Sequence, residues 1–110
     1  MGRKKRKKER PKPFYGLAEV RELVREGRVL CSEQALDGAR YSFGWDEPDI
    51  RDALLRLEMK HFHKSDVSEF NKWRVFDFYK ARGLKGENVY THFYVDTKVG
   101  FLIVNSFKEI

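Results

Sequence analysis

The segment NVYTHFYVD, residues 88–96, alternates apolar side chains with rings and a charged group. In an extended strand, successive side chains point to opposite faces of the sheet. One face of this strand would therefore carry two phenols, an imidazole and a carboxylate, from Tyr90, His92, Tyr94 and Asp96. The other face would carry the apolar side chains and pack against helices. Exposed rings of this kind can stack on the bases of RNA.

Basic residues lie on the other segments with strand-like patterns, at Lys64, Lys80, Arg82 and Lys108. Cations beside exposed rings can bind the phosphates of RNA while the rings stack on its bases. We therefore take Lys80, Arg82 and His92 as candidate RNA-binding residues. The alternative is an ordinary solvated sheet face, and composition alone does not separate the two readings.

The formal net charge of +6 is unevenly distributed along the chain. Residues 1–13, MGRKKRKKERPKP, hold eight of the 23 lysines and arginines and one acid, a balance of +7. Residues 14–59 carry six basic and ten acidic groups, whereas residues 60–110 carry nine basic and six acidic groups. The second half of the chain is thus the side expected to face a polyanion.

The basic tail, residues 1–13, has no apolar residue after Met1 and contains Pro11 and Pro13. We expect it to be disordered on its own, because it has no apolar surface to bury. It could strengthen RNA binding by displacing counterions from the phosphates. The alternative is an extension that only increases solubility.

Three segments in the first half have the apolar spacing of helices. The first starts at Leu17 and ends at Gly27. The second follows Ser32 as its N-cap, and the third starts at Asp46 with Pro48 in its first turn. The apolar stripes of all three are expected to be core.

After Met59 the apolar period changes to two, which predicts strands over residues 60–66, 75–82, 88–96 and 101–108. Helices followed by strands are typical of an α+β fold. We therefore predict an antiparallel β-sheet with the N-terminal helices packed on one face. Residues 14–110 are expected to form this single domain.

Several classes of protein are excluded by what the sequence lacks. The longest apolar run, residues 99–104, is too short to span a bilayer. No apolar stretch follows the basic N-terminus, so we do not expect it to be a signal peptide. The single cysteine, Cys31, allows no internal disulfide and suits a reducing cytoplasm. His61 and His63 would share a strand face, but a zinc site needs further ligands. We expect a cytoplasmic protein without metal, cofactor or membrane association.

Three short segments resemble the MqsR family of bacterial toxins: HFHKS at 61–65, NVYTHFYV at 88–95 and the terminal LIVNSFKEI. The segment VRELVREGRV, residues 20–29, resembles the first helix of that family and its exit. The resemblance runs, with gaps, from Leu17 to the C-terminus. It implies a RelE-like fold and an endoribonuclease that cleaves messenger RNA. It also implies an MqsA-like antitoxin partner, with a zinc-binding domain and a helix-turn-helix domain that binds DNA.

The resemblance implies catalytic roles for four positions. The lysine of the aromatic-Lys-Ser motif falls on Lys64, and the tyrosine of the penultimate strand falls on Tyr90. The lysine of the terminal Ser-Phe-Lys-Glu falls on Lys108. The fourth position, a glutamine after a tryptophan in the family, is occupied by Arg74.

Two features depart from the family pattern. The segment 65–73 is shorter than usual, so Arg74 could be a shifted neighbour instead of a substitute for the glutamine. Asn105 is an extra residue between the valine and the serine of the last strand. We expect it to form a β-bulge, which would re-aim Phe107 and Lys108.

RNA can be cut without a metal when the 2′-hydroxyl attacks the adjacent phosphorus, leaving a cyclic phosphate and a free 5′-hydroxyl. Lys64 and Lys108 would hold the phosphate with help from Arg74, while Tyr90 would orient the 2′-hydroxyl or transfer a proton. The sequence does not assign the acid, the base or the cut triplet, although the family favours GCU. One alternative is a non-catalytic nucleic-acid-binding protein on the same fold, and another is a chromosomal relative that has lost cleavage, given Arg74 and the insertion of Asn105.

Deleting residues 2–12 is expected to weaken RNA binding and to flatten its salt dependence without moving the cut site. The slope of log K against log salt should fall by about 0.7 for every phosphate that the shortened chain no longer neutralises. Fluorescence anisotropy of a labelled RNA at several salt concentrations measures this slope. An unchanged slope would assign the tail to another task.

Overall fold

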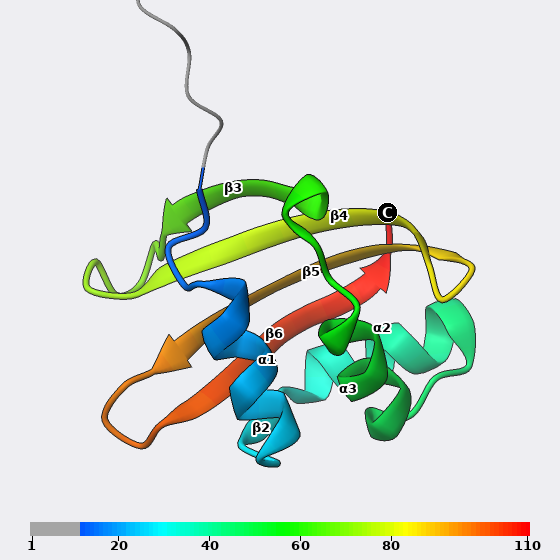
Figure 1. Cartoon of the computed structure of the whole chain (residues 1–110), viewed down its shortest axis with the longest axis horizontal. Helices are drawn as coiled ribbons and strands as arrows, with labels where there is room; N and C mark the ends of the chain where they lie inside the picture. The colour runs from blue at the N-terminus through cyan, green and yellow to red at the C-terminus, as the bar shows by residue number, and fades with distance from the viewer. Residues whose placement is uncertain (1–11) are drawn as a thin grey trace, which may run out of the picture.

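The computed structural model describes residues 12–110, so most of the predicted basic tail lies outside the described part (Figure 1). The helices are α1 (Leu17–Arg25), α2 (Glu33–Phe43), α3 (Glu47–Leu55) and the short 3₁₀ helix η1 (Met59–His61). The strands are β2 (Val29–Cys31), β3 (Phe62–Val67), β4 (Val75–Leu84), β5 (Glu87–Asp96) and β6 (Phe101–Glu109). They form one sheet in the order β2-β6-β5-β4-β3.

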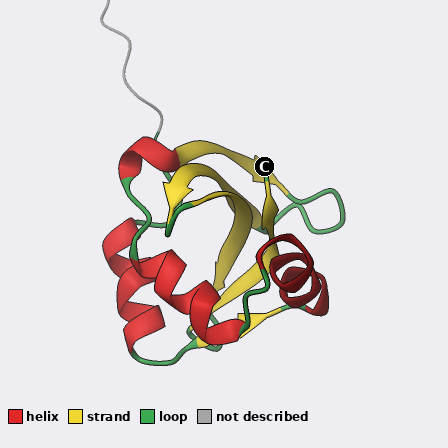
Figure 2. Cartoon of the chain, turned by 90° about the vertical axis from the view of Figure 1, so that its right-hand side faces the viewer, coloured by secondary structure: helices red, strands yellow, loops and turns green. Residues whose placement is uncertain are grey.

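The predicted α+β fold is confirmed, with helices first and an antiparallel sheet of β3 to β6 afterwards. Figure 2 shows the curved sheet with the helices packed against it. Within the described chain, no helix is both long and apolar enough to cross a bilayer. The helix starts agree with their predicted caps: the Ser32 hydroxyl accepts a hydrogen bond from the Ala35 N–H, and Asp46 and Asp49 form a capping box.

The sheet also contains a short parallel strand, β2, that the sequence pattern did not predict. Val29 pairs with Leu102, and Cys31 pairs with Val104. Three residues are too few to show a period of two, and only the neighbouring β6 provides their hydrogen bonds. The sheet is therefore mixed at this edge.

The pair His61 and His63 does not share a strand face as predicted. His61 ends η1, where its buried ring accepts a hydrogen bond at Nδ1 from the Glu58 N–H at 3.0 Å. His63 lies at an irregularity of β3, between Phe62 and Lys64. Among residues 12–110, no three His, Cys, Asp or Glu side chains gather as metal ligands.

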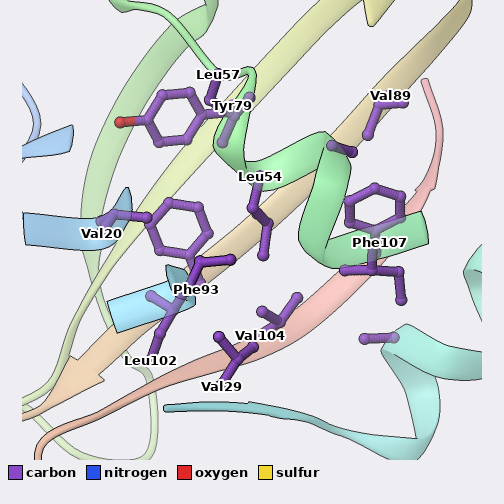
Figure 3. Packing of buried hydrophobic residues seen from close by; sticks show 14 of the residues in the cluster. Val20, Val29, Leu54, Leu57, Tyr79, Val89, Phe93, Leu102, Val104 and Phe107 are labelled. Atoms are coloured by element: carbon purple, nitrogen blue, oxygen red, sulfur yellow. The ribbon is translucent and has the colours of Figure 1, made fainter. Parts of the chain in front are cut away.

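The core lies between the helices and one face of the sheet. The strands contribute large side chains that are fully buried, namely Tyr79, Phe93, Leu102, Val104 and Phe107. Figure 3 shows these side chains meeting Val20 of α1, Leu54 of α3 and the nearby Leu57. Alternate side chains of β4 to β6 therefore pack in the core, and the side chains between them lie on the other face of the sheet.

The buried carboxylate of Asp77 connects the start of the domain to two strands. It accepts hydrogen bonds from the backbone N–H groups of Phe14, at 3.0 Å, and Tyr15, at 2.8 Å. It also accepts one from the hydroxyl of Ser65 on β3. A buried carboxylate is tolerated only when such donors replace water. Asp77 therefore holds the chain before α1 against β4 and β3.

Helix α2 lies along the C-terminal half of β6, beyond the end of β2 (Figure 1). The Ser32 hydroxyl donates a hydrogen bond to the Asn105 carbonyl, and the Ser42 hydroxyl accepts one from the Glu109 N–H. These contacts satisfy backbone groups at an edge that would otherwise be open. Gly38 allows the close approach, because a Cβ atom there would lie 2.5 Å from the Phe107 carbonyl oxygen.

Gly38→Ala is therefore expected to lower the free energy of unfolding by about 1–3 kcal/mol, as overpacking does. The loss should occur even though alanine favours a helix interior by about 1 kcal/mol. Denaturant unfolding measures it. Gly16→Ala is the control, because the space around Gly16 is open, and a smaller loss is expected there. Equal stability of Gly38→Ala and the parent would contradict the close contact.

Candidate active site

The face of the sheet away from the core carries two rows of side chains, set by strand register. The first row joins Lys80 of β4, Tyr90 of β5 and Lys108 of β6. The second row joins Lys64 of β3, Phe78 of β4 and His92 of β5. Tyr90 and His92 are two residues apart, so the rows lie about 7 Å apart. We call this whole side of the sheet, away from the core, the open face.

Contacts within and between the two rows connect the family-implied residues Lys64, Tyr90 and Lys108. The Lys108 Nζ atom lies 5.6 Å from the centre of the Tyr90 ring, and the Lys64 Nζ atom lies 5.0 Å from the centre of the Phe78 ring. The Tyr90 hydroxyl lies 3.1 Å from Nδ1 of His92. Lys64 is also paired with Asp66, at 2.9 Å. Two ammonium groups thus flank a hydrogen-bonded phenol and imidazole.

The protonation of this phenol and imidazole follows from their surroundings. Partial burial raises the pKa of Tyr90, and the Lys64 ammonium offsets part of that rise. Burial lowers the pKa of His92, and the positive charge of Lys108 lowers it further. Near neutral pH, Tyr90 is therefore a protonated phenol and His92 a neutral imidazole. The pair offers one proton donor and one proton acceptor.

The bulge predicted at Asn105 is confirmed, because the register shifts where Ser106 pairs with His92 and Val104 pairs with Phe93. The bulge accommodates the extra residue, so both Val104 and Phe107 face the core. If Asn105 instead followed regular alternation from Val104, Lys108 would turn toward the core. The bulge therefore decides that Lys108 reaches the open face.

Two predicted residues lie away from Tyr90. The Arg74 guanidinium lies 4.3 Å from the centre of the Tyr94 ring. Tyr94 is four residues along β5 from Tyr90, a separation of about 13 Å. Arg82 lines a different hollow, together with Arg21 and Lys60. The remaining candidates, Lys80 and His92, belong to the two rows of the open face.

Two rings of the open face, those of Phe76 and Phe78, are absent from the residues predicted from sequence. The Phe78 ring lies 4.7 Å from the His92 ring, and the Phe76 ring lies 5.1 Å from it, centre to centre. In the segment VFDFYKAR their spacing suggests a buried face, whereas the side buried in the structure carries Asp77 and Tyr79. Phe76, Phe78 and Lys80 are alternate residues of one strand, so their side chains share a face. The charge of Lys80 indicates that this face is the solvated one.

Lys108→Met is expected to raise the pKa of His92 toward its ordinary value of about 6.5, because one nearby positive charge is removed. NMR titration of the imidazole measures the change. Lys98→Met, on the turn between β5 and β6, is the control and should leave this pKa unchanged. If Lys108→Met also leaves it unchanged, Lys108 does not lie beside His92.

Residues 12–109 match the family described as motility quorum-sensing regulator, toxin of MqsA. The match covers nearly the whole chain and includes every strand that carries the open face. Comparison with curated proteins gives no match. By its sequence, the chain belongs to the MqsR toxin family.

Proposed function

We propose that this chain is the toxin of a toxin–antitoxin pair and an endoribonuclease that cuts messenger RNA at short motifs. The observation that carries the proposal is the position of Tyr90, which lies between Lys108 and a neutral His92 on an open face. Membership of the MqsR toxin family supports it. Cutting RNA would stop translation and growth.

The scissile phosphate would bind between the ammonium groups of Lys64 and Lys108. Both side chains are exposed, and both stand over rings that limit their movement. Attack by the 2′-hydroxyl places additional negative charge on the phosphate oxygens, which nearby cations stabilise. Lys64 would exchange its bond to Asp66 for one to the phosphate.

The proton of the 2′-hydroxyl would pass to the Tyr90 oxygen while the phenol gives its own proton to Nδ1 of His92. The short distance between the two groups supports this relay, and the neutral state of His92 leaves it free to accept a proton. The 2′ oxygen then bonds to phosphorus, and the bond to the 5′ oxygen breaks. One of the two lysines would donate a proton to that leaving oxygen. The products are a 2′,3′-cyclic phosphate and a 5′-hydroxyl.

Neighbouring parts of the RNA would run across the same sheet. Lys80, which lines a hollow with Tyr90 and Lys108, would bind an adjacent phosphate. Arg74 would bind the RNA backbone beyond Tyr94, at a distance from the reacting phosphate. Arg82 would contact RNA only where the strand bends around the β4–β5 turn. Binding along the face would hold the scissile bond over Tyr90.

The family description names MqsA as the partner of the toxin. We propose that an MqsA-like antitoxin, with a zinc-binding domain and a DNA-binding helix-turn-helix domain, neutralises this chain in the cytoplasm. Co-expression of that antitoxin should restore the growth of cells that produce the toxin.

Tyr90→Phe and Lys108→Ala are each expected to slow cleavage of a short RNA by about 10²-fold or more, since each removes a group that acts on the reacting atoms. Lys64→Ala should behave in the same way. The rate of the parent should fall as the pH drops below the pKa of His92, because a protonated imidazole cannot accept the proton. Gel analysis of labelled RNA measures the rates, and product-end analysis identifies the cyclic phosphate.

Arg25→Ala is the control for these variants, because Arg25 is exposed on α1 and paired with Glu22. It should cut at the parental rate. Circular dichroism should show that every variant is folded. If Tyr90→Phe and Lys108→Ala cut at the parental rate, this site is not the nuclease centre. If the parent binds RNA without cutting it, the chain is a binding protein on this fold.

A further inference from the structure

A pocket of about 500 Å³ adjoins the candidate catalytic residues on the open face. Three half-buried rings, from Phe76, Phe78 and His92, line it. The polar side chains of Arg74 and Asn105 also line it. We call it the aromatic pocket. Flat rings surrounded by hydrogen-bonding groups are the features that bind a single unstacked base.

The aromatic pocket shares residues with the proposed site of cleavage. His92 lines the pocket and also approaches the Tyr90 hydroxyl. Phe78 lines the pocket and also lies under the Lys64 ammonium. A nucleotide whose phosphate lies between Lys64 and Lys108 would therefore have the pocket within reach of an adjoining base.

Asn105 lines this pocket from the bulge in β6. Asn105 has no partner in the β5–β6 register and is half-buried, whereas Val104, Ser106 and Phe107 are buried. The Asn105 carbonyl accepts the hydrogen bond from Ser32. Its side-chain amide makes no hydrogen bond to any other residue within the described range 12–110. One donor group and one acceptor therefore remain for a ligand.

We propose that the aromatic pocket holds one RNA base next to the scissile phosphate and that the Asn105 amide reads the hydrogen-bonding edge of that base. This inference rests on the proposed ribonuclease function. Stacking on Phe76, Phe78 and His92 favours every base, because each base has an aromatic face. The amide distinguishes bases, because their edges differ in the order of donors and acceptors. Asn105 thus determines sequence specificity and takes no part in proton transfer.

Two substitutions at Asn105 separate recognition from chemistry. Asn105→Ala removes the amide, and the ratio of cleavage at the most and least favoured base of one position should fall about tenfold. Asn105→Asp keeps the shape but replaces the donor with an acceptor, so a different base should be favoured there. Both variants should fold, since only the backbone carbonyl of Asn105 contacts Ser32.

The measurement uses a pool of RNA with randomised sequence and determines the 5′ ends of the cut products. Gln34→Ala is the matched control, because it removes an exposed amide on α2 and should leave the preference unchanged. Phe76→Leu should lower cleavage of all sequences alike, because it weakens stacking without altering the amide.

An unchanged base preference in both Asn105 variants would overturn the inference. So would a loss of cleavage at every sequence in folded Asn105→Ala, because the residue would then serve the chemistry. If the parent cuts no RNA, the proposed function fails separately. Selection of bound RNA from the same pool then tests the aromatic pocket, and the same base preference for the parent and both Asn105 variants would overturn it.

Discussion

The register between β5 and β6 sets the geometry of the whole site. It places Tyr90 opposite Lys108 and, two residues along, His92 opposite Ser106. A slip of one residue would turn Tyr90 into the core and expose Val89 in its place. The buried side chains of β5 and β6 prevent this slip, since they fit only one alignment. The same packing that stabilises the domain therefore positions the groups of the open face.

The end of β6 shows how an irregular feature can be held in place. The bulge at Asn105 interrupts the pairing with β5, and α2 compensates at the other edge of the strand. The Ser32 hydroxyl both accepts a hydrogen bond from the α2 backbone and donates one to the bulge carbonyl. The start of α2 and the bulge are thus one hydrogen-bonded unit. Lys108 gains a fixed position near a chain end, where side chains are otherwise mobile.

The lysines of the open face influence the protonation of its phenol and imidazole groups. Lys108 is close enough to lower the pKa of His92, and Lys64 is close enough to affect that of Tyr90. The same closeness would allow both lysines to hold one phosphate. Asp66 forms an ion pair with Lys64, whereas Lys80 and Lys108 of the same face have no such partner among residues 12–110. In the proposed mechanism, a phosphate would replace this carboxylate as the partner of Lys64.

The class of fold and most members of the open face could be predicted from the amino-acid sequence. The spacing of apolar residues distinguished the helices from the strands. Cap residues such as Ser32 and Asp46 marked where helices begin. The alternation of side chains in β5 assigned Tyr90 and His92 to the same face of the sheet. Each of these patterns involves residues that are close together in the sequence, so the sequence alone predicts them. It also led to the MqsR family through short motifs that carry Lys64, Tyr90 and Lys108.

Features that depend on neighbours far along the chain became visible only in the folded molecule. Strand β2 exists because β6 offers it hydrogen bonds, and His61 left the predicted strand because its ring caps η1. By residue type, Phe76 and Phe78 would be predicted to lie in the core. The structure instead buries Asp77 and Tyr79, so the two phenylalanines lie on the opposite face of β4. Whether Arg74 or Lys80 lies beside Tyr90 was likewise set by strand register. Hydrogen bonds and packing between distant segments fix such choices, and no local pattern contains them.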